Sequence, residues 1–114
     1  ANNLNPSQLK KKEGDMINKY ILKGDYIILL DENGKSYSSI EFSKKIENFM
    51  INSFKRIVFI IGGAYGFSDK VYSIADEKVS LSKMTFNHQM IRVFFYEQLY
   101  RAFTIIKNEK YHNQ

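Results

Sequence analysis

The chain has 114 residues, of which 44% are hydrophobic and 25% are charged, and it contains no cysteine. This length and composition are typical of one globular domain, so we expect a single domain spanning residues 1–114. The lack of cysteine excludes disulfides and thiolate metal sites, and two histidines without a carboxylate cluster predict no metal site.

Lysine and arginine number 17 against 12 acidic residues, which gives a formal net charge of +5. This balance is a mild bias toward polyanions such as nucleic acids. No run approaches the roughly 20 apolar residues that a membrane span needs. The first residues, ANNLNPSQLKKKEGD, lack the hydrophobic core of a signal peptide. We therefore expect a cytoplasmic protein that has no membrane partner.

The hydrophobic pattern alternates between helices and strands. DYIILL and RIVFII are continuous apolar runs, the pattern of strands that are buried on both faces. Such alternation predicts an α/β fold with a mostly parallel sheet. In chain order we expect a helix at 8–22 capped by Ser7, a strand at 25–30, a turn at 31–35, a helix from Ser38 or Ser39 to Asn52, a strand at 56–61, a short helix at 68–75, a strand at 78–82 and a helix at 87–107.

The segments after the three expected strands are the first places to look for a ligand site. Ligands of open α/β sheets bind beyond the carboxyl ends of the strands. IGGAYG follows the second strand but matches neither GxGxxG nor a P-loop, so it specifies no dinucleotide or triphosphate. Taken alone, it is a tight strand-to-helix turn, and DENGK after the first strand is an ordinary turn sequence.

The last expected helix is apolar almost all round. A helix of this kind is buried on several sides, and one small domain rarely supplies that much cover, so we expect a second subunit against it. Arg92 and Arg101 lie within this helix and need partners, either a carboxylate such as Glu97 or the phosphates of RNA. His88 is interpreted as a local capping or packing residue. One side of the helix carries Met90, Val93, Tyr96, Tyr100 and Phe103.

Three stretches together closely resemble the RlmH family of bacterial methyltransferases, within the SPOUT or α/β-knot superfamily. They are IVFIIGGAYG, SLSKMTFNHQMIRVFFYEQLYRAF and the terminal YH, and the resemblance covers the chain from about Asn5 onward. It implies an α/β fold with a C-terminal trefoil knot. It also implies a homodimer that uses S-adenosylmethionine to methylate N3 of a pseudouridine in 23S ribosomal RNA, within the large subunit or the ribosome.

The resemblance also implies particular site residues. Arg101, Tyr111 and His112 become candidates on the substrate side, with His112 as a conceivable base and Arg101 as a stabiliser of the developing anion. In the knot the C-terminal stretch would thread through a loop, and the segment Leu81–Phe86 would be the knotted loop that lines the cofactor site. The implied cofactor-binding residues are Leu30, Gly62, Leu81, Ser82, Lys83, Met84, Thr85 and Phe86.

Members of the family normally begin with a strand, a helix and another strand before the equivalent of QLKKKEGDMINKYIL. We expect these elements to be missing from this sequence. Two other functions stay open at this point. One is a non-catalytic module that binds RNA or the ribosome, and the other is a different nucleotide-binding enzyme that uses the glycine-containing turn.

Overall fold

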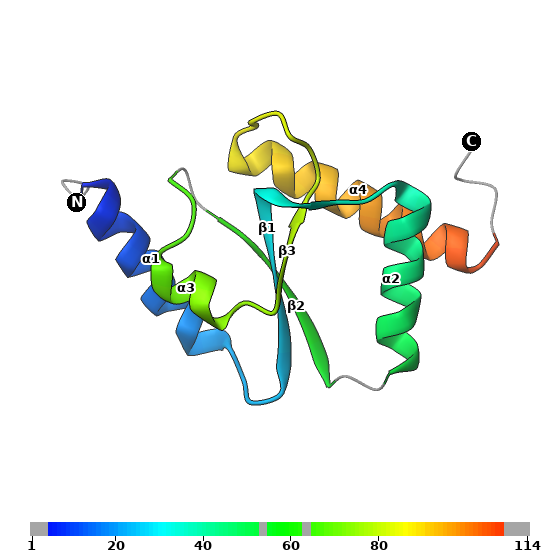
Figure 1. The fold of residues 1–114 in the computed structure, drawn as a ribbon, viewed down its shortest axis with the longest axis horizontal. Helices are drawn as coiled ribbons and strands as arrows, with labels where there is room; N and C mark the ends of the chain where they lie inside the picture. Colours follow the sequence, from blue (N-terminus) through cyan, green and yellow to red (C-terminus); the bar gives the residue numbers. More distant parts are fainter. Residues whose placement is uncertain (1–4, 53–54, 63–64, 109–114) are drawn as a thin grey trace.

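Three parallel strands form the sheet of this computed structural model, which describes residues 5–52, 55–62 and 65–108 (Figure 1). The strands are β1 (Asp25–Ser36), β2 (Arg56–Ile61) and β3 (Glu77–Ser80), in the order β2-β1-β3. β1 therefore has a neighbour on each side. Its apolar run from Ile27 to Leu30 is buried on both faces, as the continuous hydrophobic pattern predicted.

Helices cover both faces of the sheet, α1 (Pro6–Tyr20) and α3 (Asp69–Ile74) on one, α2 (Ser39–Ile51) and α4 (His88–Ile106) on the other (Figure 1). Successive side chains of β1 alternate between two cores, as the period of a strand requires. Ile28 packs with Phe42 and Phe95 on the α2–α4 face, and Leu29 packs with Val71 on the opposite face. The predicted α/β fold with a parallel sheet is thereby confirmed.

Polar side chains cap the helices at their N-termini. Asn5 caps α1 by accepting a hydrogen bond from the Gln8 N–H at 2.8 Å, while the Gln8 side chain accepts one from the Asn5 N–H at 3.1 Å. The prediction of Ser7 as this cap was wrong by two residues, because Pro6 suits the first helical position. Ser38, Ser68 and Asn87 cap α2, α3 and α4 by the same side-chain contact.

The expected turn after residue 30 is instead an irregular continuation of β1. Leu30 is paired with Val79 of β3, and five residues later Lys35 is paired with the same Val79. The residues between them bulge out of the sheet, and the strand then continues to Ser36. A Cβ on Gly34 would lie only 2.6 Å from the carbonyl carbon of Lys78, so the bulge presses directly on the β3 backbone.

α4 returns across the sheet after β3. It packs along α2 and also contacts β2, which lies at the opposite edge from β3. The last helix thus crosses the face of the central strand. Among the described residues, no helix has the length and apolarity needed to cross a lipid bilayer.

A charged pair ties the first residues of β1 and β2 to the end of α1. Arg56 donates to both carboxylate oxygens of Asp25, at 3.0 and 2.6 Å, and to the Tyr20 carbonyl oxygen at 2.8 Å. The Asp25 carboxylate also accepts the Leu22 N–H at 2.7 Å. The hydrogen bonds from Arg56 and then from the Leu22 N–H hold the pKa of Asp25 below its usual 3.8.

Replacing Arg56 with methionine should destabilise the fold at neutral pH but not in acid. Because the pKa of Asp25 is lower in the folded chain than in the unfolded one, the pair stabilises the fold fully above pH 3.8. That contribution is lost as the pH falls through the folded pKa. Thermal unfolding followed by circular dichroism should show the gap in Tm between wild type and Arg56→Met narrowing below pH 3.8. A gap that stays constant as the pH falls would contradict this role for the pair.

Candidate functional site

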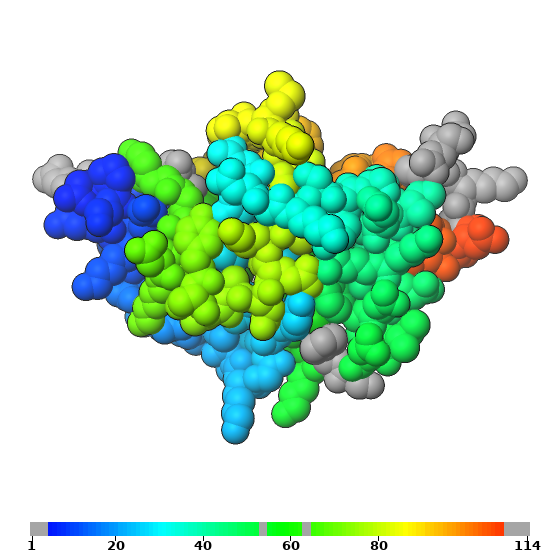
Figure 2. Space-filling view, in the orientation of Figure 1, coloured from blue at the N-terminus to red at the C-terminus, as the bar shows by residue number. Residues whose placement is uncertain are grey.

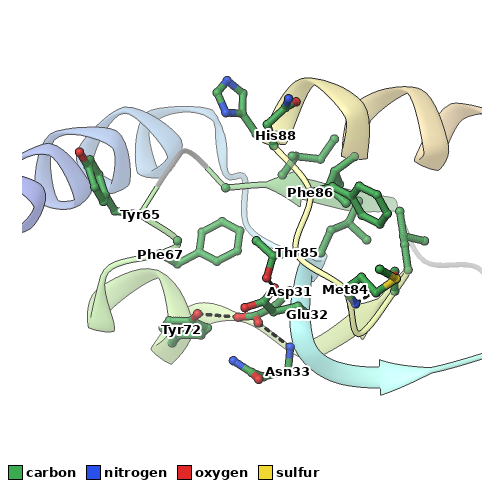
Figure 3. Close-up of a pocket in the computed structure, with 18 residues that line it drawn as sticks. Asp31, Glu32, Asn33, Tyr65, Phe67, Tyr72, Met84, Thr85, Phe86 and His88 are labelled. Atoms are coloured by element: carbon green, nitrogen blue, oxygen red, sulfur yellow. Dashed lines mark hydrogen bonds between the residues drawn. The ribbon is translucent and has the colours of Figure 1, made fainter.

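A cleft of about 800 Å³ opens at the carboxyl ends of the three strands (Figure 3). Its wall is formed by the residues that follow Leu30 in β1, by the segments after β2 and β3, by α3 and by the start of α4. The residues that line it are Leu30, Asp31, Glu32, Asn33, Ile61, Gly62, Tyr65, Gly66, Phe67, Tyr72, Leu81, Ser82, Met84, Thr85, Phe86, Asn87, His88 and Ile91. This edge is where ligands of parallel α/β sheets bind.

The bulge of β1 joins the cleft to α3 through Asp31. One carboxylate oxygen of Asp31 accepts the Tyr72 hydroxyl, and the other accepts the Asn33 N–H at 2.9 Å. Partial burial and the hydrogen bond to Asp31 raise the pKa of Tyr72 to about 12. The phenol therefore stays protonated at neutral pH and remains a hydrogen-bond donor, and the Asp31 carboxylate is held in one orientation.

The same bulge holds the loop between β3 and α4. Thr85 Oγ1 donates to Glu32 Oε2 at 2.7 Å. In Figure 2 the segment after β3, in yellow, lies directly above the last residues of β1, in cyan. Within the loop, the Met84 N–H donates to Ser82 Oγ at 3.0 Å, and Ser80 Oγ donates to the Ser82 carbonyl oxygen at 2.8 Å. These contacts fix the loop without a regular secondary structure.

Gly62, the first residue after β2, lies against the ring of Phe67. A Cβ on Gly62 would lie 3.1 Å from the ring, a tighter contact than nine in ten real Cβ contacts. Phe67 is buried and meets the Tyr72 ring edge-to-face, with centroids 5.7 Å apart. The small residue therefore lets an aromatic ring form part of the cleft wall.

The charge of the cleft differs from that of the whole chain. The described lining residues include two carboxylates, Asp31 and Glu32, and one histidine, His88, but no lysine or arginine. Lys78 lies outside this lining, with its ammonium 5.6 Å from the centroid of the Tyr72 ring. No group of three or more metal-ligating side chains occurs in the described part of the chain.

The residues expected to bind a cofactor come together in the structure, with one exception. Leu30, Gly62 and five residues of the loop after β3 line the cleft, whereas Lys83 is exposed and does not. Arg101 lies on α4, where its guanidinium pairs with Glu97 at 2.7 Å, which is the carboxylate alternative considered above. Tyr111 and His112 lie outside the described residues. The five loop residues are Leu81, Ser82, Met84, Thr85 and Phe86.

Several lining residues were not predicted individually as site residues. Asp31, Glu32 and Phe67 lie in segments that follow expected strands, where a ligand site was expected, but the local pattern predicted only turns there. Nothing in the local sequence marked Tyr72 as a neighbour of the cleft. Asn87, rather than His88, caps α4 by accepting the Met90 N–H at 2.9 Å, which leaves His88 exposed at the rim of the cleft.

The fold is a parallel α/β domain with a cleft at the carboxyl edge of its sheet. Comparison with known proteins gives the family. Residues 1–112 match the family model described as "Predicted SPOUT methyltransferase". This chain belongs to the SPOUT methyltransferase family.

The similar proteins are ribosomal RNA methyltransferases by name. The chain is 57% identical over 112 residues to ribosomal RNA large subunit methyltransferase H of Christiangramia forsetii, which covers 98% of this chain and 71% of the relative. The proteins of that name from Phocaeicola vulgatus and Flavobacterium psychrophilum are 57% and 56% identical over the same shares. SPOUT methyltransferases use S-adenosylmethionine as methyl donor, so the expected cofactor is confirmed at the level of the family.

Replacing Gly62 with valine should weaken S-adenosylmethionine binding. The added methyl groups must push the Phe67 ring out of its position in the cleft wall. Calorimetric titration of the folded variant should give a clearly higher Kd than wild type. The second change Phe67→Leu should recover part of the affinity, since it removes the ring that clashes. A folded Gly62→Val protein that binds S-adenosylmethionine with wild-type affinity would show that Gly62 is not part of the cofactor site.

Proposed function

We propose that this chain binds S-adenosylmethionine in the cleft and methylates large-subunit ribosomal RNA, at N3 of a pseudouridine in the 23S molecule. The single observation that carries the proposal is the cleft itself. It gathers Leu30, Gly62 and the 81–86 loop at the carboxyl edge of the sheet, in a chain more than half identical to ribosomal RNA methyltransferases. The net charge of +5 suits an RNA substrate.

The residues present suit a nucleoside cofactor. Leu30, Leu81 and Phe86 offer apolar surface for a base, while the backbone after β2 and β3 offers polar groups for the ribose. S-adenosylmethionine supplies a methyl group that is already activated on a sulfonium. The chain therefore has to hold donor and acceptor in line and to accept the proton of the pseudouridine N3–H.

His112 is proposed as the base and Arg101 as the stabiliser of the anion that forms when N3 loses its proton. An imidazole has an unperturbed pKa near 6.5, which suits a base at neutral pH. A guanidinium close to the uracil-like ring would stabilise negative charge on its oxygens. Tyr111 is assigned to the same substrate side, next to His112 in the chain.

The proposed role of Arg101 requires a second subunit. Arg101 is ten residues beyond Ile91, the last lining residue on α4, which is about 15 Å along a helix axis. Arg101 is therefore too far along its own helix to reach the cleft of its own subunit directly. We propose that it serves the cleft of the partner in a homodimer built through α4.

The exposed face of α4 supports this dimer. The five side chains that the sequence placed on one side of the helix are between 37% and 62% exposed in the single chain. Large apolar side chains at helical spacing on one exposed face mark an interaction surface. The face consists of Met90, Val93, Tyr96, Tyr100 and Phe103.

Replacing Tyr96 with glutamate should convert the dimer to a monomer. A carboxylate at the centre of an apolar interface would be buried without a partner, which is costly. Light scattering at micromolar protein should give the dimer mass for wild type and the monomer mass for the variant. Met50→Glu, a matched change of an exposed apolar residue on α2, should leave the mass unchanged. A monomeric wild-type protein would reject the dimer.

The C-terminal trefoil knot is part of the same proposal. We propose that the C-terminal stretch threads through a loop of the chain and that Leu81–Phe86 is the knotted loop, a rare exception to the rule that proteins are unknotted. The return of α4 from one edge of the sheet to contact β2 at the other edge supports this path. An experimental structure in which the loop and α4 leave the sheet unthreaded would reject it.

The test of the proposed function is methyl transfer from radiolabelled S-adenosylmethionine to large ribosomal subunits and assembled ribosomes that lack this modification. We expect label in 23S RNA at one pseudouridine, located by mass spectrometry of nuclease fragments. A protein that binds ribosomes but transfers no label would instead be the non-catalytic module, and binding of ATP or a dinucleotide in place of S-adenosylmethionine would indicate the other enzyme class.

A further inference from the structure

The cleft is acidic although the chain is basic. The formal charge of the whole chain is +5, yet the described lining residues carry Asp31 and Glu32 and no lysine or arginine. The function proposed above gives neither carboxylate a role. Two negative charges at this position would attract a ligand that carries a positive charge.

The two carboxylates are held differently. Both oxygens of Asp31 accept hydrogen bonds from the protein, one from the Tyr72 hydroxyl and one from the Asn33 N–H. Glu32 accepts one hydrogen bond, from Thr85 to Oε2, and is exposed at the cleft. Glu32 therefore keeps a carboxylate oxygen available to the cleft, while Thr85 limits where that carboxylate can point (Figure 3).

The charge of the ligand changes during methyl transfer. The bond between the methyl carbon and sulfur breaks and a bond between that carbon and the acceptor nitrogen forms. Sulfur keeps the electron pair of the broken bond, so the sulfonium cation becomes a neutral thioether. S-adenosylmethionine and its product S-adenosylhomocysteine thus differ by one positive charge and one methyl group.

We propose that the Asp31–Glu32 pair gives the cleft its selectivity for the sulfonium cofactor over the thioether product. Glu32 is the member of the pair that keeps a carboxylate oxygen available to the ligand. This inference rests on the proposed function, because it assigns the ligand of the same cleft. The carboxylates attract the positive sulfur and lose that attraction when the methyl group has left. The acidic pair therefore favours loading of the donor and release of the product.

The expected size of the effect follows from electrostatics in a partly hydrated cleft. Two opposite unit charges separated by several ångströms, at an effective dielectric constant between those of protein and water, shift binding by roughly threefold to tenfold. Salt screens exposed charges over a Debye length of about 10 Å at 0.1 M, so the selectivity should fall as ionic strength rises.

Three variants separate the effect of the Glu32 charge on ligand affinity from the effect of the position of the loop after β3. Glu32→Gln removes the charge but keeps a side-chain oxygen that can accept the Thr85 hydroxyl. Thr85→Val keeps the charge and removes that hydrogen bond. Glu47→Gln is the matched control, since Glu47 is exposed on α2 and does not line the cleft. Each protein is titrated calorimetrically with S-adenosylmethionine and with S-adenosylhomocysteine.

Wild type should bind the sulfonium more tightly than the thioether. In Glu32→Gln the ratio of the two affinities should fall by about threefold or more, mainly through weaker binding of S-adenosylmethionine. In Thr85→Val both ligands should weaken together with the ratio preserved, and Glu47→Gln should match wild type. A ratio that Glu32→Gln leaves unchanged would overturn the inference while leaving the proposed function intact. Failure of wild type to bind either ligand would instead overturn the proposed function.

Discussion

Deleting residues 111–114 should lower methyl transfer to ribosomes by about 10²–10⁴-fold, the usual effect of losing one positioned acid–base group. The deletion removes His112, the proposed base, and Tyr111 beside it. It leaves the cleft residues and α4 in place, so the affinity for S-adenosylmethionine and the dimer mass should stay close to wild type. Single-turnover transfer of labelled methyl groups measures the loss.

A shorter deletion provides the control for this experiment. Removing only residues 113–114 keeps Tyr111 and His112 and should retain nearly full activity. His112→Ala alone should reproduce most of the loss if the imidazole is the base. It should also remove the activity component that rises with pH near the titration of a histidine, around 6.5. Full methyl transfer by the protein that ends at residue 110 would show that the tail has no part in the reaction.

Gly34→Val should cost about 3 kcal/mol of stability or more, at the upper end of the range for overpacked sites. A Cβ at this position would lie 2.6 and 2.7 Å from the Lys78 carbonyl carbon and oxygen, and 2.7 Å from the Val79 nitrogen. These are backbone atoms of β3, which cannot rotate away as a side chain can. The edge of the sheet must therefore separate or the bulge must move.

Urea denaturation of wild type, Gly34→Val and Lys35→Ala measures this effect. Lys35 is the exposed neighbour of Gly34, and its truncation should change the free energy of unfolding by less than about 0.5 kcal/mol. Because Glu32 belongs to the same bulge, Gly34→Val should also weaken cofactor binding in whatever fraction stays folded. A Gly34→Val protein as stable as wild type would mean that the bulge does not pack on β3 in solution.

The parts of the fold that depend on local sequence could be predicted. Two continuous apolar runs indicated β1 and β2 at their observed first residues, Asp25 and Arg56. Ser38 and Ser68 marked helix starts because a side chain that caps a helix acts on residues next to it in the chain. The error at the first helix was a choice between two good capping residues, and Pro6 with Gln8 favoured Asn5.

The parts that depend on distant contacts could not be predicted. DENGK has true turn chemistry, and the chain does leave the sheet there, but its return to pair with Val79 depends on β3, more than 40 residues away. The lining residues Phe67 and Tyr72 gain their roles from Gly62 and Asp31, to which no sequence period connects them. Arg101 is a further example, because the sequence alone allowed its guanidinium either an ion pair with a carboxylate or a contact with RNA.

A crystal structure of the protein soaked with S-adenosylmethionine tests the central claim most directly. We expect the cofactor in the cleft at the carboxyl ends of the strands, with its adenosine between Leu30, Gly62 and the 81–86 loop and its sulfonium on the side of Glu32. Density for the cofactor at any other place on the molecule, or an empty cleft at saturating ligand, would contradict the assignment of this cleft as the methyl-donor site.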